Sequence, residues 1–292
     1  DCSKYAGTKS RNYSKSLSEE QLNWLVKDLS YVDKNTPIIV TAHAQIFYPK
    51  TTDTFKIDHS ESTTKEFFNI LKGYDVNIVT GHTHTIFNAR QDETKSLGAD
   101  KIFEHNAGAV CGSWWWSGHL TDGIHLSPDG TPGGYSIWDI NGTDIKWRYK
   151  ATNWDDSYQF RAYDLNMVTF SFADVPKMKD IKKLNDSFGR YVNAYDGAQN
   201  NEVLINVWNW NSGWKLSVID ENGKELAWTK TYAYDPVHIA ALSVKRFNDS
   251  SITDVPSFVT EDSMPHFFKV IADSPETDLV ITVTDEFGNI FT

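Results

Sequence analysis

The sequence predicts an α+β fold in two parts, a layered region over residues 1–152 and an antiparallel β-sandwich over residues 153–292. Three observations lead to this prediction. Two helix-like segments each precede a short apolar strand in the region before Gly81. From residue 101 onward the patterns are those of strands. Beyond residue 151, about seven short strands alternate with turns, which is typical of a sandwich.

The first helix is predicted over residues 18–31. Ser18 and Gln21 have the spacing of a capping box, in which each side chain accepts a hydrogen bond from the other residue's backbone amide. Leucines follow at helical spacing and give the helix an apolar face. The next segment, 37–42, is short, apolar and rich in β-branched residues, which indicates a strand buried on both faces of a sheet.

The same order of elements then repeats. Thr63 and Glu66 predict a second capped helix over residues 63–72, and Gly73 is placed to end it. The segment 76–80 predicts a second buried strand. Both strands therefore follow a helix, as in layered folds in which helices cover a sheet.

Histidines follow both predicted strands at the points where the strands end. His43 comes after the first strand, and His82 and His84 come after the second. In layered folds, ligands gather beyond the carboxyl ends of such strands. The sequence therefore predicts that these three imidazoles lie near one another.

The region from 101 to 150 changes to strand patterns. Strands are predicted at 101–105, 135–140 and 144–150, the last two joined by a turn at Asn141-Gly142. A loop rich in Gly and Trp, residues 111–119, lies between the first two strands.

The second part continues with strands and turns to the C-terminus, and the boundary is predicted near residues 151–157. Strands are predicted at 160–170, 203–208, 214–219, 225–230, 237–244, 266–273 and 278–284.

Composition excludes several classes of partner. The net charge of −11 argues against nucleic acid as a bulk partner, because binding to its backbone needs a basic surface. No stretch approaches about 18 apolar residues, so no membrane span is expected. Two cysteines, Cys2 and Cys111, permit at most one disulfide. The chain begins at Asp1 rather than Met, which indicates that a preceding segment has been removed.

The segment Gly81-His82-Thr83-His84 has the features of a metal or phosphate site. Side chains two residues apart on an extended segment point the same way, so both imidazoles can face one small space. Neutral imidazole is a common metal ligand, and Gly81 allows close approach of a ligand. The alternative is that these are surface or core histidines with ordinary hydrogen bonds.

With these residues, the sequence resembles the calcineurin-like metallophosphoesterase family. The family pattern runs Asp-x-His, Gly-Asp-x-x-Asp, Gly-Asn-His-Asp/Glu, an isolated His and Gly-His-x-His. Gly81-His82-Thr83-His84 matches the last element and His43 matches the isolated His. The region after residue 129 is similar to the C-terminal portion of Bacteroidetes-type members. The resemblance implies that the first part belongs to a four-layer α/β/β/α sandwich.

The resemblance also implies a cofactor and a reaction. Members hold two divalent metal ions (Mn, Fe, Zn or Mg) and hydrolyse phosphate mono- or diesters with a metal-activated hydroxide. By resemblance, His43 and His82 bind one metal and His84 binds the other.

The first three motifs of the family pattern do not occur in the sequence. They supply the carboxylates, the Asn ligand and the catalytic His, so no catalytic residue is assigned within this chain. We expect the chain to lack the N-terminal part of the catalytic domain, to bind at most one metal weakly, and to be inactive alone. Two metals need carboxylates to offset four positive charges.

Other residues offer further predictions. His105, Asn106 and His119 are candidates for lining the substrate side of a cleft, with structural hydrogen bonding as the alternative. The tryptophans from Trp208 to Trp214 indicate either a surface platform for carbohydrate or the core of a sandwich. The competing function is accordingly a glycan- or protein-binding sandwich with a non-functional half-site. The resemblance to exported proteins implies a periplasmic or extracellular location.

Overall fold

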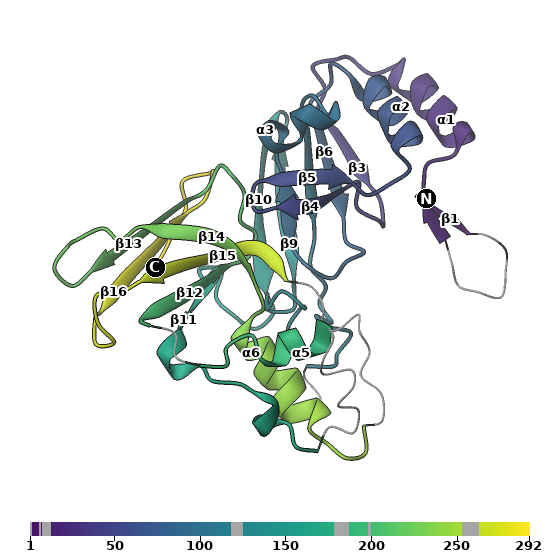
Figure 1. Cartoon of the computed structure of the whole chain (residues 1–292). Helices are drawn as coiled ribbons and strands as arrows, with labels where there is room; N and C mark the ends of the chain where they lie inside the picture. The colour runs from purple at the N-terminus through teal and green to yellow at the C-terminus, as the bar shows by residue number, and fades with distance from the viewer. Residues whose placement is uncertain are drawn as a thin grey trace. The chain divides into compact units, whose positions relative to one another are not determined.

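The computed structural model divides into two compact units (Figure 1). Unit 1 holds Asp1–Ala107 and Trp138–Arg148, and unit 2 holds Gly108–Ile137 and Tyr149–Thr292. The residues described are 2–5, 7, 13–117, 125–177, 187–197, 200–252 and 263–292. Both units contain helices and strands, so the predicted α+β class is confirmed. The boundary at 152/153 stays a prediction.

The sheet of unit 1 has the strand order β3-β6-β8-β7. Strands β3 (Ile38–Thr41), β6 (Val76–Thr80) and β8 (Ile102–Asn106) are parallel, and β7 (Phe87–Ala89) pairs antiparallel with β8. The predicted strands at 37–42 and 76–80 are present. Burial of the first on both faces is wrong. In the described part of the chain β3 is an edge strand, and Ile39 is 40% exposed.

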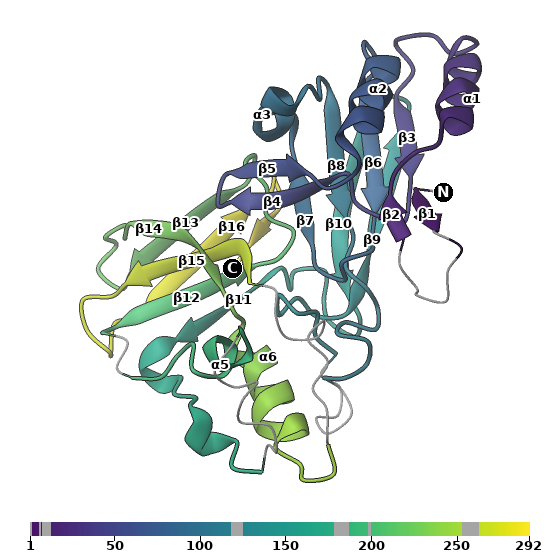
Figure 2. The same cartoon turned by 45° about the vertical axis from the view of Figure 1, so that its right-hand side comes forward.

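Two helices cover one face of this sheet. Helices α1 (Glu19–Leu29) and α2 (Glu61–Leu71) lie side by side in both views (Figures 1 and 2). Leu22 of α1 and Phe67 of α2 are buried in one apolar cluster with Ile78 of β6. The amphipathic faces predicted from the leucine spacing therefore pack against the strands.

The helix ends agree with the sequence in part. Ser18 and Gln21 form the predicted capping box at the start of α1. The cap predicted at Thr63 and Glu66 is wrong, because α2 begins at Glu61 with Ser60 as its N-cap. Thr63 instead donates its hydroxyl to the Ser60 carbonyl at 3.2 Å.

The other face of the unit 1 sheet contacts a β-hairpin. Strands β9 (Gly134–Asn141) and β10 (Asp144–Ala151) pair with each other, and the predicted turn is present with Gly142 at φ 62°. Trp147 stacks on Phe103 of β8, with ring centroids 5.5 Å apart. Aromatic packing therefore fixes this face of the sheet.

Unit 2 contains two antiparallel sheets. One has the order β11 (Phe160–Asp164), β12 (Glu202–Val207), β15 (Met264–Ile271), β14 (Trp228–Ala233). The other has the order β13 (Lys215–Asp220), β16 (Leu279–Thr284), β17 (Ile290–Phe291). These strands agree with most of the segments predicted from the sequence.

One predicted strand of unit 2 is helical. The segment 237–244 lies in α6 (Pro236–Ile239) and the π-helical turn Ala240–Phe247 that continues it. Asp235 caps the helix by accepting the His238 amide at 2.9 Å, and Pro236 occupies the first helical turn. The strand prediction is wrong here because a short buried helix and a short buried strand have similar apolar patterns.

The remaining elements are short. They are β1 (Ser3–Tyr5), β2 (Tyr13–Lys15), β4 (Phe47–Thr51), β5 (Thr54–Ile57), α3 (Gln91–Thr94), α5 (Ser187–Val192) and the 3₁₀ turns Lys95–Leu97, Leu165–Met167 and Phe172–Asp174. Among the residues described, no helix is long and apolar enough to cross a membrane.

Replacing Ser18 by Ala tests the capping box. We expect the free energy of unfolding to fall by about 1 kcal/mol, because the Gln21 amide loses its acceptor. Chemical denaturation measures the change. Ser60→Ala is the matched control, since Ser60 is an N-cap without a side-chain cap hydrogen bond. Equal losses in the two variants would contradict the role given to the Ser18 hydroxyl.

Candidate functional site

The candidate site lies where β3 and β6 end in unit 1. The amide of Gly81 donates to the carbonyl of His43 at 3.1 Å, which joins the two loops. The imidazoles of His43 and His82 meet, with Nε2 of His43 3.0 Å from Nδ1 of His82. The structure therefore brings together two of the three histidines predicted as metal ligands, from segments 39 residues apart in sequence.

Tyr13 of β2 completes a hydrogen-bonded row. Its hydroxyl lies 2.5 Å from Nε2 of His82, so His82 has a partner at each ring nitrogen. Burial, Lys15, His43 and His84 together lower the pKa of His82 to about 4, which keeps it neutral at pH 7. The sequence does not point to Tyr13, because the N-terminal segment has no periodic pattern to place it.

His84 has an unusual backbone conformation. Its φ is 60°, in the left-handed region that costs L-residues roughly 1–2 kcal/mol. His84 is one of the groups that lower the pKa of His82, so the two imidazoles lie within electrostatic range of each other. Backbone strain of this kind is frequent at functional sites.

A buried carboxylate supports both loops. Glu104 of β8 is fully buried and accepts the backbone amides of Ile46 at 2.8 Å and Phe47 at 2.7 Å. It also accepts the hydroxyl of Thr80 at 2.8 Å. Burial raises the pKa of Glu104 to about 7, and the three hydrogen bonds oppose that rise. Glu104 is not among the predicted site residues, although a Glu within an apolar strand is a signal that could have found it.

Asn106 is buried next to the second loop. Its side-chain amide donates to the Thr83 hydroxyl and the Thr85 carbonyl, both at 2.6 Å. It therefore fixes the chain around His84. The structure gives Asn106 these partners within unit 1, and its predicted role in lining a substrate cleft stays a prediction.

His105 points to the other face of the sheet. Its Nδ1 lies 2.6 Å from the side-chain oxygen of Asn88, and its ring is 5.2 Å from that of Trp147. Burial lowers the pKa of His105 to about 3. Its predicted contact with substrate also stays a prediction, and His119 lies outside the described residues.

The donor set can be compared with what metal ions require. Metal–nitrogen bonds of about 2.0–2.1 Å place two imidazole nitrogens on one ion about 3 Å apart. The separation of 3.0 Å between His43 and His82 fits two ligands of one ion. Among the described residues, however, no group of three or more His, Cys, Asp or Glu side chains could hold a metal ion. The pair alone does not fit the two-metal centre.

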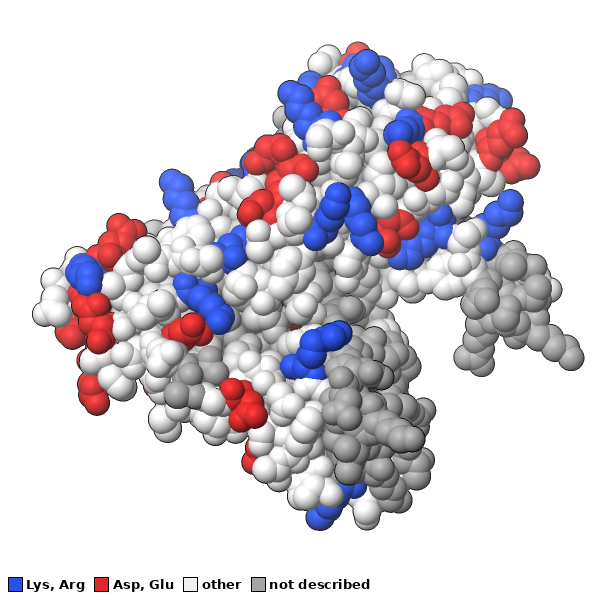
Figure 3. All heavy atoms as spheres, in the orientation of Figure 1, with Lys and Arg blue, Asp and Glu red and all other residues white. Residues whose placement is uncertain are grey.

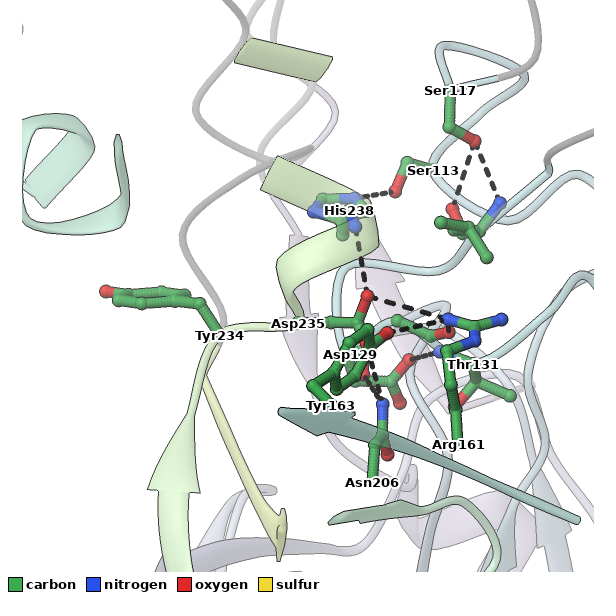
Figure 4. Close-up of polar contacts among 12 residues, drawn as sticks. Ser113, Ser117, Asp129, Thr131, Arg161, Tyr163, Asn206, Tyr234, Asp235 and His238 are labelled. Atoms are coloured by element: carbon green, nitrogen blue, oxygen red, sulfur yellow. Dashed lines mark hydrogen bonds and ion pairs between the residues drawn. The ribbon is translucent and has the colours of Figure 1, made fainter. Parts of the chain in front are cut away.

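Unit 2 has its own buried polar cluster (Figure 4). Asp235 accepts the Tyr163 hydroxyl at 2.6 Å and the Asn206 amide at 3.0 Å, and it lies 3.6 Å from the Arg161 guanidinium. The backbone of Gly130 lies directly against the Asp235 side chain. A Cβ added at Gly130 would lie 2.0 Å from the Asp235 carboxyl carbon. The close approach of backbone to carboxylate therefore requires glycine.

Ser113 and His238 form another buried contact of unit 2. The serine hydroxyl lies 2.9 Å from Nε2 of His238, and the Tyr191 hydroxyl lies 2.8 Å from its Nδ1. Both Ser113 and His238 have no exposed surface. The pair therefore satisfies buried polar groups rather than presenting a nucleophile.

The tryptophans between 208 and 214 belong to the core. Trp208 is fully buried, Trp210 is 9% exposed and Trp214 is 6% exposed. The core interpretation of this segment is confirmed, and a carbohydrate platform there is wrong. Cys2 and Cys111, both within the described residues, form no disulfide with each other.

Comparison with known families concerns mainly unit 2. The family model described as the C terminal of calcineurin-like phosphoesterase matches residues 104–291, more than half of the chain. The match begins at Glu104 and leaves out His43, His82 and His84. A comparison with curated proteins found no match.

The stability of Glu104→Gln should differ from the wild type in a pH-dependent way. The pKa of Glu104 rises from 4.5 to about 7 on folding, so the folded state holds the proton more tightly. That contribution is present below pH 4.5 and is lost as the pH rises through 7. One pKa unit corresponds to about 1.36 kcal/mol. The free energy of unfolding of the wild type should therefore fall by about 3 kcal/mol relative to that of the variant across this pH range. Denaturant unfolding at several pH values measures it, and parallel curves would contradict the assignment.

Gly130→Ala should strongly destabilise unit 2. The added Cβ would collide with Asp235, and φ at Gly130 is +79°. We expect a loss of about 3 kcal/mol or more in the free energy of unfolding. Gly223→Ala is the control, because Gly223 has φ +80° and an added Cβ there would meet nothing within 4 Å. It isolates the backbone cost, about 1 kcal/mol. Similar losses would show that the Asp235 contact is unimportant.

Proposed function

Because this chain belongs to the calcineurin-like phosphoesterase family, we propose that it takes part in the metal-dependent hydrolysis of a phosphate mono- or diester. The loops that carry His43, His82 and His84 in unit 1 form part of the proposed active site. One observation carries this proposal, the convergence of His43 and His82 at 3.0 Å where two parallel strands end.

The proposed metal ligands are His43, His82 and His84. A divalent ion would supply Lewis acidity and lower the pKa of a bound water towards neutrality. The chain's own contribution is positional. Glu104 and Asn106 hold the histidine loops through buried hydrogen bonds.

The carboxylates of a two-metal centre would have to come from a further polypeptide segment, the N-terminal part of the catalytic domain. The described residues offer no complete metal cluster, so we propose that this chain alone binds at most one ion weakly and turns over little substrate. We also propose that unit 1 forms part of a four-layer sandwich, that the sheets of unit 2 form a β-sandwich, and that the protein is periplasmic or extracellular. The last proposal and the Bacteroidetes type rest on the resemblance alone.

The competing proposal of a glycan-binding module has less support. It relies on the tryptophans near Trp210 as a surface platform, and these are buried. A protein-binding role for unit 2 has no observation in its favour among the described residues.

Hydrolysis of an aryl phosphate tests the proposed function. It would be measured with Mn²⁺ and with EDTA, on this chain and on an N-terminally extended form. We expect metal-dependent turnover mainly in the extended form. His82→Ala should lower it at least about 100-fold, since changes even to outer-shell groups of metal sites cost 10–100-fold.

His125→Ala serves as the control, because His125 belongs to unit 2 and packs against Trp115. Turnover that survives EDTA, or that is equal in His82→Ala and the wild type, would contradict the proposal. So would the absence of turnover from both forms.

A further inference from the structure

The N-terminal hairpin is fixed beside the histidine loops. The Ser60 amide donates to the Lys15 carbonyl at 2.9 Å, and the Ala44 amide donates to the Cys2 sulfur at 3.1 Å. Cys2 is buried. Strand β2 therefore has a defined position next to His43.

Two side chains of β2 lie on the same face. Tyr13 and Lys15 are two residues apart on a strand, so both point the same way. Tyr13 reaches His82, and the Lys15 ammonium lowers the pKa of the same ring. Tyr13 is 40% exposed, so its side chain is in part open to solvent.

The row of hydrogen bonds from Tyr13 through His82 to His43 can be oriented in two directions, which differ in the atom that donates each bond. In the inward direction, Tyr13 donates to Nε2 of His82, and Nδ1 of His82 donates to Nε2 of His43. In the outward direction, His43 donates to His82 and Nε2 of His82 donates to the Tyr13 oxygen. The proton count is the same in both, and only the outward direction leaves the Tyr13 hydroxyl proton available to a ligand.

Lys15 provides positive charge at the same place. Its ammonium lies 2.5 Å from the Asp58 carboxylate, which also accepts the Gln45 amide at 2.5 Å. An ammonium has three donors, and the contact with Asp58 uses one of them. The chain has a net charge of −11, which repels anions overall. Positive and negative side chains are interspersed on the face drawn in Figure 3. A local cation is therefore needed to attract an anion to one place on the surface.

We propose that Tyr13 and Lys15 bind a phosphoryl oxygen beside the histidines. The inference deepens the proposed function, on which it rests, by assigning two substrate-positioning residues to the same site. The anion accepts the Tyr13 hydroxyl proton and a Lys15 ammonium proton. Its binding selects the outward direction of the row, so that His82 carries its proton on Nε2 when phosphate is bound.

Binding of inorganic phosphate in the presence of EDTA tests the proposal without metal. Tyr13→Phe and Lys15→Met should each weaken binding by about fivefold, the effect of one partly exposed hydrogen bond to a charged group. Lys27→Met on α1 and Tyr31→Phe in the turn after α1 are matched controls. Both should leave the dissociation constant for phosphate unchanged. Calorimetric or NMR titration measures the constants.

Asp58→Asn distinguishes a ligand-binding lysine from a purely structural one. Removing the carboxylate releases Lys15 and should strengthen phosphate binding by about threefold. Asp92→Asn is the charge-matched control, since Asp92 pairs with Arg90 at 3.3 Å elsewhere in unit 1. If Lys15 only anchors the hairpin, Asp58→Asn will weaken binding or leave it unchanged.

Nitrogen-15 NMR of the histidine rings gives a readout that a structural role would not move. In the phosphate-bound wild type, His82 should carry its proton on Nε2, and Tyr13→Phe should abolish any phosphate-induced change in that tautomer. A bound state with the proton on Nδ1 would overturn the proposal. So would a wild type that binds no phosphate, or variants that bind it as the wild type does.

The two proposals fail in different ways. If metal-dependent hydrolysis depends on His82 but phosphate binding and KM are unchanged in Tyr13→Phe and Lys15→Met, the hairpin assignment is wrong and the proposed function stands. If phosphate binds as expected but no form of the protein hydrolyses the ester, the proposed function is wrong and the anion site remains.

Discussion

The carboxylate of Glu104 connects the two loops on which the histidine site depends. It accepts amides from the loop after His43 and a hydroxyl from the strand that leads to His82. A buried charge is costly unless hydrogen bonds compensate it. Because its three donors come from the loop after His43 and from the end of β6, neither segment can move away without leaving this acceptor partly unsatisfied. The arrangement of the histidines thus depends on the hydrogen bonds that satisfy one buried acidic side chain.

Unit 2 follows the same principle with different groups. Asp235 caps α6 with one carboxylate oxygen and accepts Tyr163 and Asn206 with the other. The turn at Gly130 passes so close to this carboxylate that no side chain fits there. A fully buried polar network limits a core to few alternative arrangements, because each partner that moves leaves another unpaired. The family match covers this unit, whereas the candidate chemistry lies in loops of unit 1.

Chemically, the site is a pair of imidazoles with a hydroxyl and an ammonium at its margin. The low pKa of His82 keeps it unprotonated at neutral pH, which is the state that binds a metal or exchanges hydrogen bonds with Tyr13. Lys15, which is paired with Asp58, adds a positive charge near the two rings. In the two proposals, recognition of a phosphoryl group is assigned to Tyr13 and Lys15, and retention of a metal ion is assigned to the histidines of the same small region.

Elements with strong local signals could be predicted from the amino-acid sequence. These include the capping box at Ser18, the strands that lead to His43 and His82, and most strands of unit 2. Capping and periodicity act over a few residues, so they can be recognised without knowing the fold. Where two short-range patterns coincide, as in the apolar run after Asp235, the local signal is ambiguous. The roles of Glu104 as the common acceptor of two loops and of Tyr13 as the partner of His82 emerge only from tertiary contacts, because these join segments 24 to 69 residues apart.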